Sequence, residues 1–417
     1  MNDVERTQSI LQSTQPTTQL PIIAFFTGSA ISYVGDMLTL LAIPWFVLQT
    51  TGSVVQTGIT AFFSTLPAVF SAFFGSALVD RLGYKRTSVI GDIASCLTVL
   101  LIPLLYSTLG LAFWQLLALV FLGGLLKSPG ITARSTMVPE LAAEANMRLE
   151  RANALSDGLA RVSRLIGAPL AGGLILLIGT SNLLWFDALS FAISALLIGL
   201  FAPPTSPIPQ IQQSESSYLK SLWSGVRFIQ HDSLILSLVI VILITNMIDA
   251  AFFSVIAPVY VKENFHSPLP LGILSAALGG AGFVGTFIFA AIGHRLPRRL
   301  TFGLGFTIGG ALRFWMFLLF PILPLLIAWS IIAGLAISPI NPLTDTIMQE
   351  RLPVEMRARV FGTMSAGFLA GVPIGTFASG YIVSWLGLPT TILIMGTLYL
   401  LATLSLLVNP VLKGMES

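Results

Sequence analysis

Residues 75–86 read Gly75-Ser-Ala-Leu-Val-Asp80-Arg81-Leu-Gly83-Tyr-Lys85-Arg86, a burst of charge between two long apolar stretches. A weaker copy follows about half the chain later and reads Gly293-His-Arg-Leu-Pro-Arg-Arg299. A short charged loop that recurs at half the chain length indicates an internal repeat of apolar segments. The chain is therefore expected to consist of two related halves.

The composition is that of a polytopic membrane protein. Hydrophobic residues make up 55% of the chain and charged residues 9%, whereas soluble domains are about one quarter charged. The apolar segments are long and uninterrupted, which indicates membrane-spanning α-helices and argues against a β-barrel. The net charge of +3 comes from loop residues, and no basic run exceeds three residues, so nothing indicates nucleic-acid binding. The single cysteine, Cys96, excludes an intramolecular disulfide.

Twelve apolar segments are long enough to cross a bilayer, which takes about 20 residues each. They lie near 21–48, 55–79, 87–106, 111–133, 155–178, 183–202, 233–259, 268–293, 300–321, 323–345, 358–384 and 388–410. Residues 1–202 and 233–417 are thus expected to form two pseudo-symmetric bundles of six helices. The Pro-, Ser- and Gln-rich linker 203–232 joins them, and its stretch 218–228 has the spacing of an amphipathic helix at the membrane surface.

Basic loop residues are distributed unevenly between the two ends of the predicted spans. With the N-terminus inside, nearly all of them face the cytoplasm and only Lys262 lies outside. The positive-inside rule therefore predicts a multi-pass protein of the inner (plasma) membrane with both termini in the cytoplasm. The polar residues 1–20 carry no cleavable signal pattern and are interpreted as a cytoplasmic tail. Tryptophans fall at the predicted outer ends, as in an interfacial belt; they are Trp45, Trp114, Trp185 and Trp385.

Asp36 and Asp249 stand at matching positions of the two halves, within the first and seventh predicted spans. A charged aspartate at bilayer depth costs about 2.5–3.5 kcal/mol on insertion scales, so each is a functional candidate. Asp36 is expected near the midplane, where burial disfavours the charged carboxylate and suits a group that exchanges protons. Asn246, Phe252 and Phe253 lie around Asp249 and suit an amphipathic ligand. The alternative for both aspartates is a structural partner on a neighbouring helix.

Other charged residues also fall within the predicted spans. Arg161 and Arg164, in the inner half of the fifth span, are interpreted as reaching toward the cytoplasmic surface. The alternative for them is a basic lining that attracts an anionic substrate. Lys127 is interpreted as a partner of Asp157. Three more are interpreted as structural; they are Asp92, Asp187 and Arg313.

Small residues recur in the fifth and eleventh predicted spans at spacings that let helix backbones approach closely. The predicted helix-packing positions are Gly167, Pro169, Gly172, Gly173, Gly371, Pro373 and Gly375. Between the second and third spans, Gly83 is expected to allow a tight turn.

Residues 75–86 resemble the loop signature between the second and third spans of major facilitator transporters. Pro169-Leu-Ala-Gly172-Gly173 is similar to the antiporter motif of drug exporters in that superfamily, although Ala168 stands where the motif has glycine. Other strings resemble the macrolide-efflux-like branch; they are Ile31-Ser-Tyr-Val-Gly-Asp36, Asp187-Ala-Leu-Ser-Phe191 and Arg359-Val-Phe-Gly362. The resemblance covers nearly the whole chain. It implies the major facilitator fold, with a substrate site between two six-helix bundles.

The resemblance also implies a role for the charged loop. In such transporters it latches the two halves together at the cytoplasmic face, so Asp80 and Arg81 are expected to act in gating. Lys85 and Arg86 belong to the same gating loop; the alternative for these two is that they only set the topology.

The expected function is that of a secondary transporter, which exports amphipathic drug- or macrolide-like molecules by alternating access with proton antiport. The alternative is an exporter of a specific lipid, siderophore or metabolite. No nucleotide-binding motif is present, and the scattered His231, His266 and His294 argue against a membrane enzyme. The expected partners are a small-molecule substrate, protons and the lipid bilayer. We expect a monomer that uses no cofactor, metal or nucleic acid.

Overall fold

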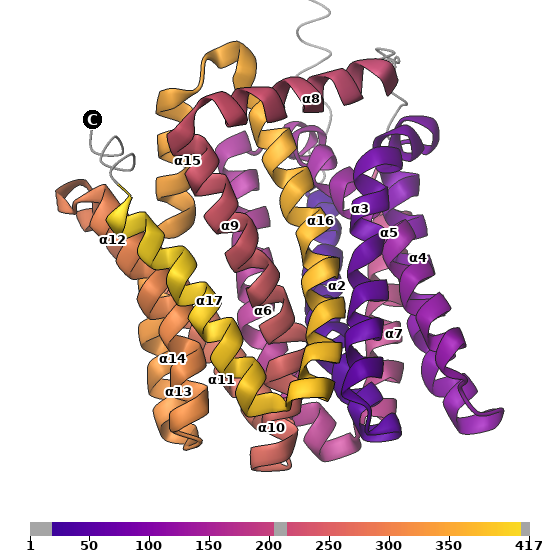
Figure 1. Cartoon of the computed structure of the whole chain (residues 1–417). Helices are drawn as coiled ribbons and strands as arrows, with labels where there is room; N and C mark the ends of the chain where they lie inside the picture. The colour runs from indigo at the N-terminus through magenta and orange to yellow at the C-terminus, as the bar shows by residue number, and fades with distance from the viewer. Residues whose placement is uncertain (1–18, 204–214, 410–417) are drawn as a thin grey trace, which may run out of the picture.

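The computed structural model describes residues 19–203 and 215–409, and every regular element in these ranges is a helix (Figure 1). Within them, twelve helical segments are long and apolar enough to cross a membrane, which confirms the all-α membrane fold expected from the sequence. The first six spans are α2 (Leu20–Thr51), α3 (Val54–Leu82), α4 (Tyr84–Thr108), α5 (Phe113–Glu144), α6 (Leu149–Ile178) and α7 (Thr180–Phe201). The predicted tail lies almost entirely in residues 1–18, outside the described residues.

Several of the second six spans contain a break in the regular helix. In the first of them, Pro258 has no N–H to donate to the carbonyl of Ser254, and the chain widens into a π-helical turn directly before it. This span consists of α9 (Ser233–Ala251), η1 (Phe252–Ile256) and α10 (Ala257–Phe265). The others are α11 (Leu269–Ile292); α12 (Arg298–Phe306) with η3 (Thr307–Ala311) and α13 (Leu312–Leu319); α14 (Leu323–Ile337) with α15 (Ile340–Arg351); α16 (Val354–Leu386); and α17 (Leu388–Val408).

Several helices extend beyond the predicted spans, and α5 and α15 are examples. α5 continues to Glu144, where the prediction ended at 133, and α15 continues to Arg351, where it ended at 345. An apolar run marks the part of a helix that crosses the bilayer, whereas backbone hydrogen bonding continues into polar sequence. The hydropathy pattern therefore located the crossings but not the ends of these helices.

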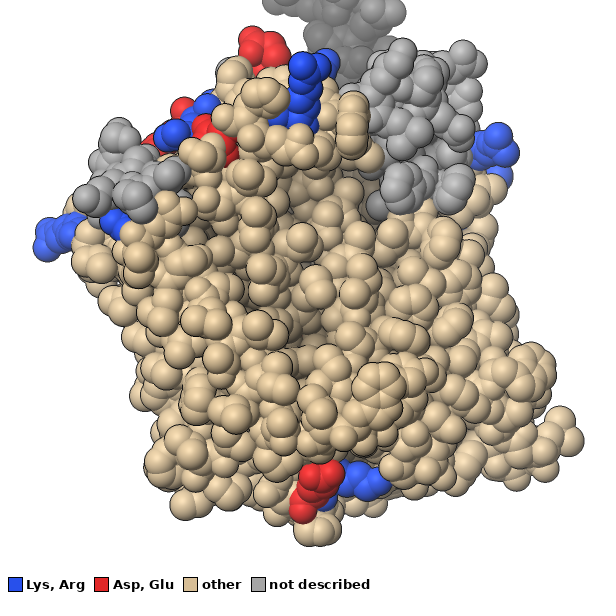
Figure 2. All heavy atoms as spheres, viewed as in Figure 1, with Lys and Arg blue, Asp and Glu red and all other residues tan. Residues whose placement is uncertain are grey.

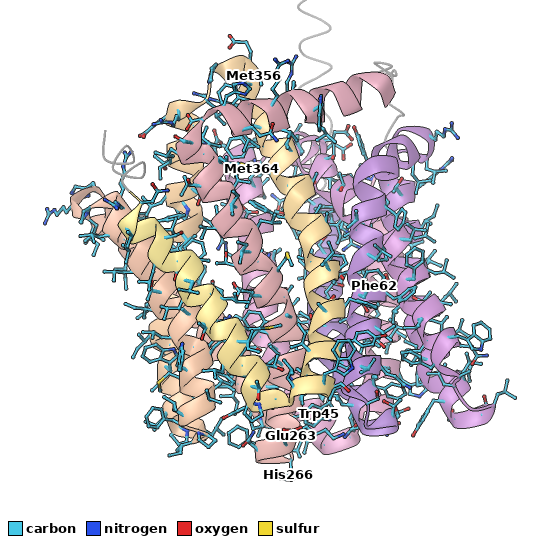
Figure 3. The ribbon with its side chains drawn as sticks, viewed as in Figure 1. Trp45, Phe62, Glu263, His266, Met356 and Met364 are labelled. Carbon is cyan, nitrogen blue, oxygen red and sulfur yellow. The ribbon has the colours of Figure 1, made fainter. Side chains whose placement is uncertain are left out.

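The molecule has two chemically distinct ends. α8 (Glu215–His231) lies across one end, and α10 lies at the other (Figure 1); we call them the α8 end and the α10 end. On the face shown in Figure 2, the charged side chains gather at these two ends and the band between them is uncharged. Figure 3 shows Met356 at the α8 end and Glu263 and His266 at the α10 end. An uncharged band between charged ends is what a membrane-spanning bundle requires.

The predicted interfacial belt of tryptophans agrees with the exposure of some of these side chains but not of all. Trp114 is 68% exposed and Trp385 is 78% exposed, as side chains of an interfacial belt would be. Trp45 is 3% exposed, so its assignment to the belt is wrong. Its indole packs in the hydrophobic core with neighbouring residues of α2, because this turn of α2 is covered by other helices.

Part of the predicted linker forms α8, which packs against α16; residues 204–214 lie outside the described residues. The Thr363 hydroxyl of α16 donates a hydrogen bond to the Leu222 carbonyl at 3.1 Å. After α8, Asp232 accepts hydrogen bonds from two backbone amides at the start of α9 and from Arg351 at 2.8 Å. Burial raises the pKa of Asp232, but these hydrogen bonds outweigh that effect and hold its pKa below the ordinary value. The junction is therefore anchored to α15.

Glycines allow the two sets of six helices to touch near the α10 end. A Cβ atom at Gly58 of α3 would lie 2.8 Å from the Cα atom of Gly380 in α16. A Cβ atom at Gly272 of α11 would lie 3.1 Å from the Cα atom of Pro169 in α6. These separations exclude any larger residue, so α3 meets α16 and α6 meets α11 at backbone distance.

The other small residues of α6 and α16 pack against several different helices. The nearest partners are Met37 for Gly167, Pro268 for Gly172, Leu243 and Met247 for Gly371, and Met247 for Gly375. Gly173 differs, because no atom lies within 4 Å of the position that its Cβ would take. Pro373 lies within the continuous helix α16. The small residues thus hold α6 against α2 and α11, and α16 against α9.

Gly172→Val is expected to destabilise the protein by about 1–3 kcal/mol, because the side chain would enter a filled contact between α6 and α11. Its Cβ would stand 3.1 Å from the Pro268 carbonyl oxygen. Thermal unfolding of the purified protein in detergent measures the effect. Gly173→Val is the matched control, with the same helix propensity and open space around it. Equal losses in the two variants would contradict the packing role of Gly172.

Candidate functional site

A cavity of about 230 Å³ lies among α2, α3, α4 and α5, and we call it the first cavity. In the described part of the chain, its charged groups are Asp36 of α2 and Lys127 of α5. The rest of its wall is mostly apolar. Side chains with hydroxyl groups also line it; they are Thr39, Ser64, Thr65, Ser95, Thr98 and Ser254.

Lys127 lies between α2 and α7, beside two carboxylates. It forms an ion pair with Asp36, and its ammonium lies 4.3 Å from the centroid of the Phe191 ring in α7. Asp187, one turn before Phe191, is fully buried and interacts electrostatically with Lys127. One oxygen of Asp187 accepts a hydrogen bond from Thr39, while Oδ1 has no hydrogen-bond partner among the described residues. Two acids and one lysine therefore share a mostly buried site.

One sequence interpretation of these residues is wrong. Lys127 pairs with Asp36 and not with Asp157, because its side chain extends from α5 toward α2 rather than toward α6. Asp157 is exposed on α6. Asp187 was expected to be structural, which its hydrogen bond from Thr39 fits, and it also interacts electrostatically with Lys127.

A second buried ion pair lies in the same helices, closer to the α8 end. Arg134 of α5 pairs with Asp92 of α4, and their side chains are 5% and 3% exposed. Serine hydroxyls complete the network: Arg134 donates to Ser88 at 3.0 Å, and Ser194 donates to Asp92 at 2.6 Å. Neither charged group lines a cavity described here. The pair joins α4, α5 and α7, in agreement with the structural role expected for Asp92.

A larger cavity of about 660 Å³ lies between the two sets of six helices, and we call it the second cavity. α2 and α6 contribute its wall on one side, and helices from α9 to α15 contribute the other. Leu40 and Ser254 line both cavities, so the two are neighbours. The second cavity reaches from Leu271, near the α10 end of α11, to Thr286, near its other end.

Asp249 lines the second cavity and forms an ion pair with Arg313 of α13. The Tyr399 hydroxyl of α17 donates a hydrogen bond to Asp249 at 3.3 Å. The Arg313 guanidinium lies 4.3 Å from the ring centroid of Phe252 and 4.9 Å from that of Phe253. Arg313 was expected to be structural, and its buried ion pair with Asp249 agrees with such a role, although the residue also lies in the wall of the second cavity.

The predicted ligand residues around Asp249 separate into different environments. Phe253 is 42% exposed and lines the second cavity, whereas Phe252 is 2% exposed and lies behind Arg313. Asn246 lines neither cavity. Asp36 and Asp249, although they match in the repeat, face different cavities and pair with helices that do not match: α5 for Asp36 and α13 for Asp249.

Arg161 and Arg164 both line the second cavity, and both are exposed. The sequence interpretation was that they reach toward the cytoplasmic surface; their place in the cavity wall supports its alternative, the basic lining. In residues 19–203 and 215–409, no ion pair joins either arginine to a carboxylate. Arg164 donates a hydrogen bond from Nε to the carbonyl of Ala160 in its own helix, at 3.3 Å.

The predicted gating loop forms the turn between α3 and α4 at the α8 end. Gly83 has φ 79°, a conformation that favours glycine, and its N–H donates to the Val79 carbonyl at 2.8 Å. Lys85 donates a hydrogen bond to the Ala202 carbonyl at the end of α7, at 2.5 Å. Arg81 and Arg86 are exposed, and the side chain of Asp80 lies outside the described residues. In the second copy, Gly293 has φ −57° and begins a 3-10 turn, so the two loops differ in conformation.

The residues missed by sequence reasoning are those whose partners lie on distant helices. Lys127 carried a usable signal, because a cation at bilayer depth requires a countercharge at similar depth. Asp36 and Asp187 both satisfy that requirement, and the sequence does not distinguish them from Asp157. No group of three or more His, Cys, Asp or Glu side chains is arranged to hold a metal ion within the described ranges.

The comparisons with known proteins agree with this architecture. A profile of the Major Facilitator Superfamily matches residues 25–254 and 238–414. Multidrug efflux pump Tap of Mycolicibacterium fortuitum is 30% identical over 381 residues, covering 90% of this chain and 92% of that protein. Macrolide efflux protein A of Streptococcus pyogenes is 21% identical, covering 95% of this chain and 97% of that protein. The crystal structure of nucleoside transporter NupG has the same fold, with a TM-score of 0.74 at 15% identity over 93% of this chain and 98% of that one. The chain thus belongs to the major facilitator superfamily, whose members are membrane transporters and not enzymes.

Proposed function

We propose that the protein exports amphipathic, drug-like small molecules and that it uses the proton gradient to do so. The second cavity supports this proposal. It lies between the two sets of six helices, combines apolar walls with a few charged groups, and has about 660 Å³, a volume suited to a drug-sized ligand. Two relatives along nearly the whole chain are named as a multidrug efflux pump and a macrolide efflux protein.

The second cavity would open to one side of the membrane and then to the other if residues 1–202 and 233–417 move as two bodies joined by the linker 203–232. We assign the α8 end to the cytoplasm, because the exposed Arg81 and Arg86 lie there. Close contacts at the α10 end, including the hydrogen bond from Lys262 of α10 to Leu48 of α2, then close the outer side. The described conformation corresponds to one that faces the cytoplasm.

The site of Asp36, Lys127 and Asp187 is the proposed coupling site. One ammonium beside two carboxylates leaves one negative charge uncompensated when both acids are ionised, and such a buried charge favours uptake of a proton. Protonation of Asp36 would weaken its pairing with Lys127 and let the ammonium move toward the unpartnered oxygen of Asp187. Because Leu40 and Ser254 line both cavities, a shift of α2 at the first cavity reaches the substrate in the second.

The loop between α3 and α4 is proposed to act as the latch of the opposite, outward-facing state. Asp80 and Arg81 lie at the cytoplasmic end of α3, where the two bodies would meet when that side closes. The turn at Gly83 sets their position relative to α4. A latch that forms only in the outward-facing state stabilises that state. Its opening then shifts the population toward the state that faces the cytoplasm.

Asp36→Asn is expected to abolish proton-driven uptake of radiolabelled chloramphenicol, an uncharged amphipathic drug, into inverted membrane vesicles. Asparagine cannot exchange a proton, so the gradient no longer drives the cycle. Asp157→Asn is the matched control, because Asp157 is exposed on α6 and lines neither cavity. Transport in the Asp36→Asn vesicles that still responds to the gradient would refute the coupling role. Wild-type vesicles without any uptake would refute export of this drug class.

A further inference from the structure

The charged lining of the second cavity is predominantly basic. Among the described residues it contains Arg161, Arg164 and Arg313, against the single carboxylate of Asp249. Arg313 is paired with Asp249 and covered by aromatic rings. In contrast, no described carboxylate forms an ion pair with Arg161 or Arg164 in the cavity wall.

Arg161 and Arg164 are placed to act together. They are three residues apart on α6, a spacing that puts side chains on the same face of a helix. Both are exposed into the cavity. A guanidinium group presents several N–H donors in a planar fork that matches the oxygens of a carboxylate, phosphate or sulfonate group. The remaining wall offers apolar contact through side chains such as Phe253, Phe283 and Leu271.

We propose that the second cavity selects amphipathic molecules that carry an anionic group, and that Arg161 and Arg164 recognise that group. This inference rests on the proposed export function and specifies its substrate class. Two positive charges in a cleft with low-dielectric walls attract anions and repel cations more strongly than in water. An anionic lipid headgroup and a soluble organic anion share this chemistry, so the test must distinguish them.

The test measures competition with chloramphenicol transport by the purified protein in liposomes. Pyrenebutyrate and pyrenylbutyl-trimethylammonium share an apolar ring system and differ in the charge of the terminal group. Pyrenebutyrate is expected to inhibit at a concentration about tenfold lower than the cation, which corresponds to 1.4 kcal/mol of selectivity. Arg161→Gln/Arg164→Gln is expected to lose this preference, measured as the ratio of the two inhibitory concentrations, whatever its own rate of chloramphenicol transport.

Arg148→Gln/Arg151→Gln is the matched control, because these arginines are exposed at the start of the same helix and line neither cavity. An anion preference that persists when phosphatidylglycerol is added to phosphatidylcholine assigns the site to soluble amphiphiles. A preference that phosphatidylglycerol abolishes assigns it to lipid headgroups. Equal inhibition by both probes, or an unchanged preference in Arg161→Gln/Arg164→Gln, would overturn the proposal. Wild-type liposomes that transport no chloramphenicol would instead count against the export function.

Discussion

Lys127→Met is expected to lower the rate of proton-driven chloramphenicol uptake into inverted vesicles by about tenfold or more, which corresponds to at least 1.4 kcal/mol. The substitution removes the cation that pairs with Asp36 and lies near Asp187. Both acids would then take up protons to avoid unpaired charge at bilayer depth, and neither would release them in the cycle. The measurement is the initial rate of uptake with and without a proton gradient.

The double variant Asp36→Asn/Lys127→Met separates coupling from stability. Breaking a buried pair by removing one partner costs about 3–5 kcal/mol, whereas removing both partners leaves no unpaired charge. Since the Lys127 and Asp36 side chains are 21% and 20% exposed, the single variant is expected to lose less than that range. The double variant is expected to regain thermal stability but not gradient-driven uptake. Full gradient-driven uptake in the single variant would exclude Lys127 from coupling.

Arg134→Met is expected to cost about 3–5 kcal/mol of stability, because it leaves Asp92 without its cation in a buried site. The Ser88 hydroxyl would also lose the hydrogen bond that Arg134 donates. Much of the variant is expected to be degraded or aggregated, since this loss is a large part of the stability of a typical domain. The yield of protein from membranes and its melting temperature in detergent measure the effect.

The paired variant Asp92→Asn/Arg134→Met tests what kind of role this pair has. It removes both charges, so stability is expected to recover in large part. Transport is expected to recover with it, because neither residue lines a cavity. A double variant that is stable but cannot transport would show that the Asp92–Arg134 pair takes part in the transport cycle. The contrast with Lys127 then distinguishes a structural ion pair from a coupling one.

The spans, the Gly83 turn and the candidate residue Asp36 could all be predicted because their signals are local. An apolar run of bilayer length forms a helix wherever it stands in the chain, since the lipid leaves no other way to satisfy its backbone. Gly83 sits where two helices meet within one residue, which needs its positive φ. Asp36 is costly at its depth whatever its neighbours are. These features follow from a few consecutive residues.

The ion-pair partners of the buried charges and the positions of the cavities could not be predicted, because they depend on how helices distant in the sequence pack together. Lys127 was assigned to Asp157, yet its counterion is Asp36, because the rotation of α5 directs its side chain toward α2. Arg313 was interpreted as structural with no partner named, and its counterion in the wall of the second cavity is Asp249. Residue spacing along one helix does not determine which face meets which neighbour.

The charged loop and its weaker copy predicted by themselves an internal repeat, and the apolar segments around them predicted the membrane-spanning helices. They did not establish where the two copies would differ: Gly83 adopts a left-handed conformation, whereas Gly293 begins a 3-10 turn. Only the tertiary structure placed Arg161 and Arg164 in the wall of a cavity between the two sets of helices. Membrane insertion is decided segment by segment from apolar surface, whereas a cavity is the space left after all twelve spans have packed.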